Sequence, residues 1–236
     1  MIPDFFVTGT GTDVGKTYVS QLLLNWVSSF IDEVIYYKPL ATGCEKSDGT
    51  YCVPDEEAVL LYASDNMPQK SLKTHVGLSY EDPLAPYAID RHLAESCNKD
   101  SLINQYKNMA FGEKKTVVVE GIGGVAVPLW EKYLVSDLIK DLALPVILVA
   151  QAHLGTINHT LLTLDHLKSK GINVLGFILN HSSKKKDMSD LTNAGIIQSF
   201  SQTPYLFTVE YGQLAFKESQ SSTLKKVFSG DFFQNI

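Results

Sequence analysis

The sequence predicts an α/β fold: a mostly parallel central sheet, flanked by helices on both faces in three layers. Its strand candidates are short, β-branched or aromatic, and almost continuously apolar, as strands buried on both faces are. Segments with helical periodicity lie between them and supply the crossovers that parallel pairing requires. No repeat, low-complexity tract or linker interrupts this pattern, so residues 1–236 are expected to form a single domain. The predicted strands are Phe5–Val7, Val34–Tyr37, Val117–Val119, Val146–Ala150 and Val174–Leu179.

Three helices are indicated by apolar residues that recur every three or four positions. The strongest pattern begins after Lys16, where one stripe comprises Val19, Leu22, Leu23, Trp26, Val27 and Phe30. A second helix precedes the third strand, with Leu102, Ile103, Tyr106 and Ala110 on one face. A third lies between the last two strands and carries Ile157, Leu161, Leu164 and Leu167.

The charge and hydropathy of the chain exclude several classes of protein. It has 20 Lys+Arg against 26 Asp+Glu, a formal net charge of −6, so it lacks the basic surface of a nucleic-acid-binding protein. Its most apolar stretch, 142–150, is far shorter than the roughly 20 residues of a membrane-spanning helix. No export signal or disulfide-type cysteine pattern is visible, so a cytoplasmic protein that contacts neither nucleic acid nor membrane is expected.

A glycine-rich segment, VTGTGTDVGKT at residues 7–17, joins the first strand to the strongest helix. Between Gly9 and Gly15 the backbone can turn several N–H groups toward a phosphate chain, and the helix N-terminus adds a favourable dipole. Lys16 would neutralise the β- and γ-phosphates, and the Thr17 hydroxyl is placed to bind Mg²⁺. The segment is one residue longer than the strict GxxxxGK[ST] pattern, and it predicts a P-loop that binds a nucleotide.

Two polar residues follow predicted strands at the sheet edge where open α/β folds bind ligands. Lys38 ends the second strand and would face the same phosphates as Lys16, although a solvated lysine before a proline turn is the alternative. Glu120 ends the third strand. An unpaired buried carboxylate is costly, so a Mg²⁺ ion shared with Thr17 explains it better than a chance surface position. Asp55, on the residues alone, is better explained as part of a helix N-terminus.

Two further segments stay ambiguous on the residues alone. The turn at 154–158 could offer backbone N–H groups to a carboxylate, or could simply start a helix. Asn180 ends the fifth strand and could contact a nucleotide base, or could form a turn.

Taken together, these segments resemble the dethiobiotin synthetase family of P-loop enzymes. The resemblance runs from Phe6 to about Asn180, through FVTGTGTDVGKT, YYKPLATG, VVVEGIGG, PVILVAQAHLGTINH and LGFILNH. It implies a homodimer that joins 7,8-diaminononanoate and CO₂, drawn from bicarbonate, into the cyclic urea of dethiobiotin. One amine would form a carbamate, ATP would phosphorylate its oxygen, and the second amine would close the ring, releasing ADP and phosphate.

The same resemblance implies a role for each matching residue. The catalytic residues would be Lys16, Lys38 and Thr12. The nucleotide would contact Gly9, Asp13, Val14, Gly15, Lys16, Thr17, Glu120, Gly123 and Asn180. The substrate would contact Thr12, Lys38, Thr42 and Gly123, together with Leu154, Gly155 and Asn158 of the neighbouring subunit. Mg²⁺ would be held by Thr17, Asp55 and Glu120, which raises Asp55 above its interpretation as a cap. Asp13 stands where the family has Glu.

Two other functions compete with this one. A partitioning-type switch ATPase shares the fold, but its loop carries a signature lysine where this chain has Gly11. A small-molecule kinase would need an arginine-rich lid, which is not evident. After Asn180 the resemblance fades: residues 203–210 read TPYLFTVE in place of the family's proline-containing base loop. In the tail, an apolar strip could dock a partner or pack on the chain's own core; it comprises Leu224, Val227, Phe228, Phe232 and Phe233.

Overall fold

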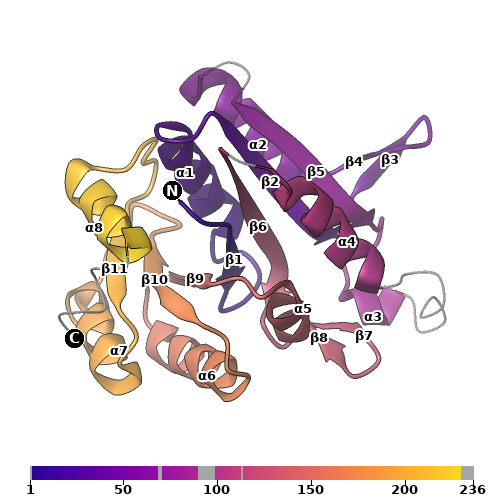
Figure 1. Cartoon of the computed structure of the whole chain (residues 1–236). Coiled ribbons are helices and arrows are strands. Elements are labelled where there is room, and N and C mark those ends of the chain that lie inside the picture. The colour runs from indigo at the N-terminus through magenta and orange to yellow at the C-terminus, as the bar shows by residue number, and fades with distance from the viewer. Residues whose placement is uncertain (1, 69–70, 90–98, 113, 230–236) are drawn as a thin grey trace.

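The computed structural model describes residues 2–68, 71–89, 99–112 and 114–229. Its centre is a seven-stranded sheet in the order β11-β10-β9-β1-β6-β2-β5, in which every adjacent pair is parallel (Figure 1). The strands are β1 (Phe5–Gly9), β2 (Glu33–Ala41), β5 (Leu72–Ser79), β6 (Lys115–Gly124), β9 (Val146–Gln151), β10 (Val174–Asn180) and β11 (Tyr205–Val209). Two antiparallel hairpins stand apart from the sheet: β3 (Glu45–Ser47) with β4 (Thr50–Cys52), and β7 (Pro128–Trp130) with β8 (Tyr133–Leu134).

Helices cover both faces of the sheet, which confirms the predicted three-layer α/β/α architecture. One face is covered by α1 (Lys16–Ser28), α2 (Pro54–Asn66) and α8 (Glu218–Ser229). The other is covered by α4 (Lys99–Ala110), α5 (Val135–Leu142), α6 (Thr156–Ser169) and α7 (Asn193–Ser201). The short elements α3 (Pro86–Ile89) and η2 (Met188–Leu191) lie in connections. In the described part of the chain, none of these helices has the length and apolar character needed to cross a membrane.

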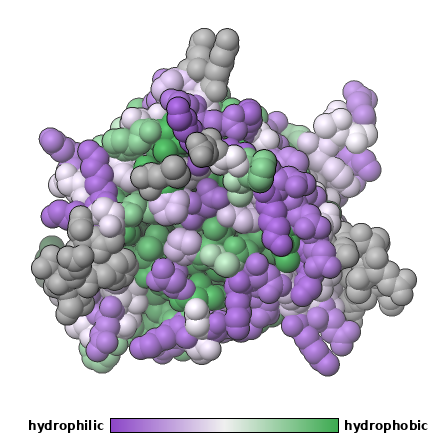
Figure 2. Space-filling view, viewed as in Figure 1, coloured by the Kyte–Doolittle hydropathy of each residue, from purple (hydrophilic) through white to green (hydrophobic). Residues whose placement is uncertain are grey.

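The core divides between the two faces because successive strand residues point in opposite directions. On β2, Tyr36 belongs to the cluster under α1 and α2, whereas Ile35 and Tyr37 belong to the cluster under α4 and α5. On β1, Phe5 and Phe6 divide in the same way. Figure 2 shows the result on one face: polar side chains cover the outer helices, and apolar side chains show between them toward the middle. The continuous apolar runs in the sequence follow from this double burial.

Two strands extend further than the sequence indicates, and this changes the surroundings of both predicted site residues. β2 continues through Lys38 and Pro39; its ladder with β6 ends at Tyr37, so beyond that point it pairs with β5 alone, where the missing proline N–H is tolerated. The prediction that β2 ends at Tyr37 is therefore wrong. β6 likewise runs through Gly121, whose added Cβ would lie 2.8 Å from the Phe6 ring. The glycines after Glu120 permit close packing rather than forming a turn.

Other boundaries differ from expectation for equally local reasons. Helix α1 ends at Ser28, so Phe30 lies beyond it and is 49% exposed, packing edge-on against Trp26. Strand β5 was not predicted, because it lies at a sheet edge and its sequence lacks the continuous apolar run of the buried strands. The segment read as a departure from the family forms the opposite edge strand, β11.

The tail packs on the chain's own core as far as it is described. On α8, Leu224 and Val227 are buried, and the Phe228 ring lies 5.1 Å from Phe5 and stacks at 5.7 Å on Trp26. Packing on the chain's own core therefore accounts for this part of the apolar strip. Phe232 and Phe233 lie outside the described residues.

The sheet order places the glycine-rich loop at a reversal of connectivity. After β1, the chain crosses to β2 on one side of the sheet, and β9 later pairs with β1 on the other. The loop from Gly9 to Gly15 therefore emerges between β6 and β9, and the carboxyl ends of these neighbours border it. Open parallel sheets bind ligands at such a switch point.

Candidate nucleotide and metal site

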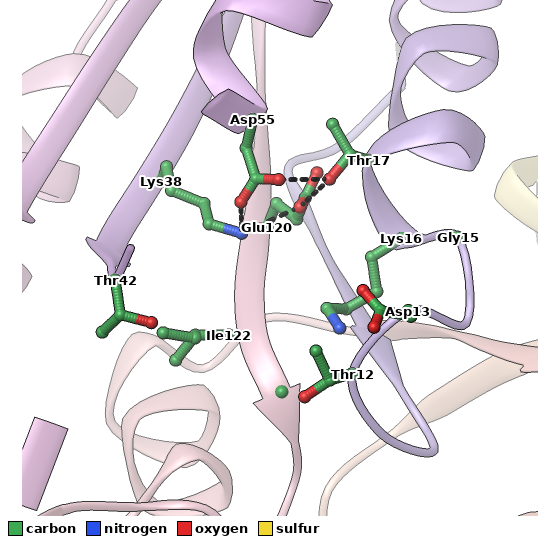
Figure 3. A pocket seen from close by; sticks show the side chains of 11 residues that line it. Thr12, Asp13, Gly15, Lys16, Thr17, Lys38, Thr42, Asp55, Glu120 and Ile122 are labelled. Atoms are coloured by element: carbon green, nitrogen blue, oxygen red, sulfur yellow. Dashed lines mark hydrogen bonds and ion pairs between the residues drawn. The ribbon is translucent and has the colours of Figure 1, made fainter. Parts of the chain in front are cut away.

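A cavity of about 400 Å³ opens at this switch point (Figure 3). It is lined by Thr12, Asp13, Gly15, Lys16, Thr17, Lys38, Thr42, Asp55, Glu120, Ile122 and Gly123. These residues come from the glycine-rich loop, the start of α1, the ends of β2 and β6, and the start of α2. The two lysines border the same cavity from opposite sides.

The loop conformation depends on glycine at the last position before α1. Gly15 has φ 93°, a left-handed conformation that a side chain rarely adopts. An added Cβ there would also overlap the amide nitrogen of Asn180. Asn180 is buried at the end of β10, and its Nδ2 donates a hydrogen bond to the Val14 carbonyl oxygen at 3.1 Å. This contact anchors the loop from below and leaves the helix N-terminus open to the cavity.

Lys16 points into the cavity and lacks a carboxylate partner at close range within the described part of the chain. Its Nζ donates to the Gly11 carbonyl oxygen at 2.8 Å across the loop. Burial and the neighbouring Lys38 cation lower the pKa of Lys16 to about 8, although Glu120, Asp55 and Asp13 act in the opposite direction. Because its charge is poorly compensated, an incoming anion would be strongly favoured beside it.

Lys38 lies at the centre of a buried ionic cluster. Its Nζ is 2.6 Å from Asp55 Oδ2 and 2.9 Å from Glu120 Oε1, and it donates to the Gly121 carbonyl oxygen at 3.1 Å. The side chains of Lys38 and Glu120 are 2% and 0% exposed, so neither charge is solvated by water. Burial disfavours the charged amine, but Glu120 and Asp55 outweigh it and raise the pKa of Lys38. The pKa of Asp55 is lowered, since Lys38 outweighs the opposing effect of burial.

Thr17 is the last member of this cluster, and its hydroxyl contacts two carboxylates although it has one proton to donate. Its Oγ1 lies 2.9 Å from Asp55 Oδ1 and 2.8 Å from Glu120 Oε1. A hydroxyl has one proton to donate and ionised carboxylates have none, so one of these two contacts is not a hydrogen bond. Three oxygens therefore lie together with a single hydroxyl proton between them.

This donor set fits Mg²⁺. The ion prefers oxygen ligands in an octahedron at 2.0–2.1 Å, which places adjacent ligand oxygens about 2.9 Å apart. Thr17 Oγ1 has that spacing from Asp55 Oδ1 and from Glu120 Oε1. The described residues contain no group of three or more His, Cys, Asp or Glu side chains suited to a metal, so this site has two carboxylates and a hydroxyl. Such a sparse set matches an ion that retains waters and binds substrate phosphates.

The structure brings together most of the residues that the sequence singled out. Ten of the eleven cavity-lining residues are among them. Ile122 was missed, because the third strand was expected to end at Glu120, whereas β6 continues to Gly124. Asp55 lies in the first turn of α2, as its helix-start interpretation requires, and its carboxylate also reaches Lys38 and Thr17. The helix-start interpretation is therefore confirmed, and the role of Asp55 as a metal ligand stays a prediction.

Six predicted site residues lie outside the cavity lining. Gly9, Val14 and Asn180 lie in or below the loop, where they support its backbone. Leu154, Gly155 and Asn158 lie at the start of α6; Leu154 is 79% exposed, and nothing approaches within 4 Å of a Cβ placed on Gly155. The contacts of all six residues with nucleotide or substrate stay predictions.

The chain is similar to proteins of known family. Residues 4–218 match the AAA domain family. A protein of Thermodesulfovibrio yellowstonii named ATP-dependent dethiobiotin synthetase BioD is 37% identical over 220 residues, covering 88% of this chain and 88% of that protein. Proteins of the same name are 36% identical in Bacillus licheniformis, over 86% of this chain and 83% of theirs, and 33% identical in Fusobacterium nucleatum, over 96% and 98%.

Solved structures support the fold. The cell division ATPase MinD of Pyrococcus furiosus superposes with a TM-score of 0.59 at 13% identity, covering 95% of this chain and 99% of that chain. The pNOB8 ParA protein, solved bound to nonspecific DNA, gives 0.58 at 9% identity, with complete coverage of both chains. At such low identity these likenesses show the fold alone.

Proposed function

Because this chain belongs to the family of ATP-dependent dethiobiotin synthetases, we propose that it closes the ureido ring of dethiobiotin from 7,8-diaminononanoate and CO₂. It is thus an ATP-dependent ligase that forms carbon–nitrogen bonds. One observation carries the proposal further than the family does: a single cavity extends from the phosphate-binding loop to Lys38 and Thr42. A γ-phosphate held by the loop and an acceptor held near Lys38 would be adjacent there.

The proposed reaction has three steps. An amine of the diamine attacks the carbon of CO₂ and loses a proton, giving a carbamate. A carbamate oxygen attacks the γ-phosphorus, the bond to the leaving β-phosphate oxygen breaks, and ADP departs. The second amine then attacks the carbonyl carbon, which expels phosphate and closes the ring, with loss of a second proton.

The residues of the cavity suit these steps. Lys16 and Lys38 would stabilise the negative charge that spreads over the transferring phosphoryl group and the carbamate. Thr17, Asp55 and Glu120 would hold Mg²⁺, which when bound supplies positive charge to the β- and γ-phosphates. Lys38, paired with Asp55 and Glu120 at the edge of the cavity, would direct its ammonium group toward the carbamate. Thr12 and Thr42, which also line the cavity, would contact the substrate.

We further propose that the enzyme is a homodimer whose second subunit contributes Leu154, Gly155 and Asn158 to the substrate carboxylate. This is supported by their position: they lie at the exposed start of α6 and do not line this chain's own cavity. The free thiols of Cys44 and Cys52 support a cytoplasmic location, because the cytosol keeps thiols reduced.

The deciding experiment follows ADP release while each component is omitted in turn from ATP, Mg²⁺, bicarbonate and 7,8-diaminononanoate. We expect ADP formation to require all four, with dethiobiotin accumulating in step as measured by mass spectrometry. A partitioning-type switch ATPase, which shares this fold, would instead release ADP without the diamine. That result would overturn the proposal, as would a phosphorylated diamine as final product, which would indicate a kinase.

A further inference from the structure

Two buried polar atoms beside the proposed metal site have no hydrogen-bond partner. They are the Tyr36 hydroxyl oxygen on β2 and Glu120 Oε2 on β6. Both side chains are 0% exposed, so bulk water does not reach either one. Unpartnered buried polar atoms are rare, because leaving one unpaired costs about 1–3 kcal/mol. Here one atom can donate and the other can accept, and they lie in neighbouring strands, so a hydrogen bond between them would satisfy both.

The strand register places the two side chains on the same face of the sheet. β2 and β6 are parallel and pair Tyr36 with Val118. Glu120 lies two residues further along β6, and residues two apart in a strand point to the same face. That face is the one under α1 and α2, where Tyr36 belongs to the hydrophobic cluster and where Thr17, at the start of α1, contacts Glu120's other oxygen.

The two oxygens of the Glu120 carboxylate are therefore in unequal surroundings. Oε1 contacts both Thr17 Oγ1 and Lys38 Nζ, whereas Oε2 contacts neither. The terminal torsion of a glutamate is broad and roughly two-fold, so the carboxylate plane is weakly fixed by its own bonds. A donor on the Oε2 side would fix it. A tyrosine hydroxyl carries one proton, so Tyr36 can be that donor.

We propose that Tyr36 is a positioning residue: its hydroxyl donates a hydrogen bond to Glu120 Oε2 and so aims Oε1 at Thr17 and at the metal. Partners in this outer position typically change metal affinity by about 10–100-fold when they are removed. The inference rests on the Mg²⁺ site proposed above. It makes Tyr36 important for metal affinity although Tyr36 is not itself a metal ligand.

The test removes one oxygen atom. Tyr36→Phe keeps the ring in the core and deletes the hydroxyl. Tyr37→Phe is the matched control, because it makes the same change one residue away on the opposite face, where the hydroxyl donates to the Leu102 carbonyl oxygen at 3.1 Å. ADP binding is measured by titration calorimetry over a series of Mg²⁺ concentrations and again in EDTA.

We expect Tyr36→Phe to need about 10-fold more Mg²⁺ for half of the metal-dependent gain in ADP affinity. Its affinity for ADP in EDTA should match that of the wild type, since the loop itself is unaltered. Tyr37→Phe should follow the wild type in both conditions. Equal Mg²⁺ dependence in Tyr36→Phe and the wild type would overturn this inference alone. No Mg²⁺ dependence in the wild type would overturn the proposed metal site together with it.

Thermal unfolding in EDTA provides a second reading that needs no ligand and no active enzyme. If the Tyr36 hydroxyl bonds to Glu120, its removal lowers the melting temperature. If the hydroxyl is an unpaired atom in an apolar core, its removal raises the melting temperature, because an unsatisfied polar group has been deleted. A rise in Tyr36→Phe would therefore contradict the proposal.

Discussion

Replacing Lys38 by methionine tests whether the buried ionic cluster depends on its single ammonium group. Methionine has nearly the shape of lysine without the charge, so the change leaves Glu120 buried beside Asp55 with no cation between them. Breaking a buried ion pair by removing one partner costs about 3–5 kcal/mol. Asp55 is 38% exposed and keeps some hydration, so the lower end of that range applies.

We therefore expect Lys38→Met to lower the free energy of unfolding by about 3 kcal/mol. For a chain of this size, 1 kcal/mol corresponds to roughly 2–4 °C, so the melting temperature should fall by about 6–12 °C. Urea denaturation and thermal unfolding are measured in EDTA, because bound Mg²⁺ would replace the missing charge. Adding Mg²⁺ should then stabilise Lys38→Met more than it stabilises the wild type.

Two further variants show whether charge is the cause. Lys73 forms an equally short ion pair with Glu33, 2.5 Å from Nζ to Oε2, but the side chains are 64% and 35% exposed. Lys73→Met should cost at most about 1 kcal/mol, as exposed pairs do. Adding Glu120→Gln to Lys38→Met removes the uncompensated charge and should recover much of the loss. If the double variant is no more stable than Lys38→Met, or if Lys38→Met unfolds like the wild type, the electrostatic argument is wrong.

Three other changes are expected to have distinct effects. Gly15→Ala should abolish ADP binding and destabilise the fold, because the new Cβ overlaps Asn180. The control Gly49→Ala is also at positive φ but has open space around it, so it should cost only the backbone strain of about 1–2 kcal/mol and leave calorimetric ADP binding intact. ADP affinity measured without Mg²⁺ should fall about tenfold per pH unit above the Lys16 pKa of about 8, because the free protein loses a proton that the complex retains. Lys16→Arg should show no such fall, and a wild-type profile that stays flat from pH 7 to pH 10 would refute the assignment. Thr17→Val should raise the Mg²⁺ concentration needed for activity about tenfold while ADP affinity in EDTA is unchanged. If the variant needs no more Mg²⁺ than the wild type, Thr17 is not a metal ligand.

Much of the site could be predicted from the chain because its signals are local. A glycine-rich loop followed directly by Lys16 and Thr17 predicts phosphate binding from neighbouring residues alone, and the structure places these residues around one cavity. Lys38 and Glu120 were selected by one topological rule, that carboxyl ends of parallel strands share an edge. That rule needs no knowledge of strand order.

Contacts between distant segments were beyond the reach of the sequence. Nothing in the pattern distinguishes β5 or β11 as edge strands, since their burial depends on which neighbours pack beside them. The extension of β2 through Pro39 is possible only because β6 has already ended its ladder at that level. Ile122 lines the cavity for the related reason that β6 continues past Glu120, where Gly121 packs closely against the Phe6 ring.

The sequence by itself determined the fold class and the family, and it predicted the phosphate-binding loop, since periodicity and motif spacing are properties of neighbouring residues. Only the tertiary structure decided which atoms meet. It placed Asp55, 38 residues from Thr17, within 2.9 Å of its hydroxyl, and Glu120, 103 residues away, within 2.8 Å. It also brought Tyr36 beneath the proposed metal site, because parallel register aligns β2 with β6. Charge pairing and burial depend on distances in space, and spacing along the chain does not fix those distances.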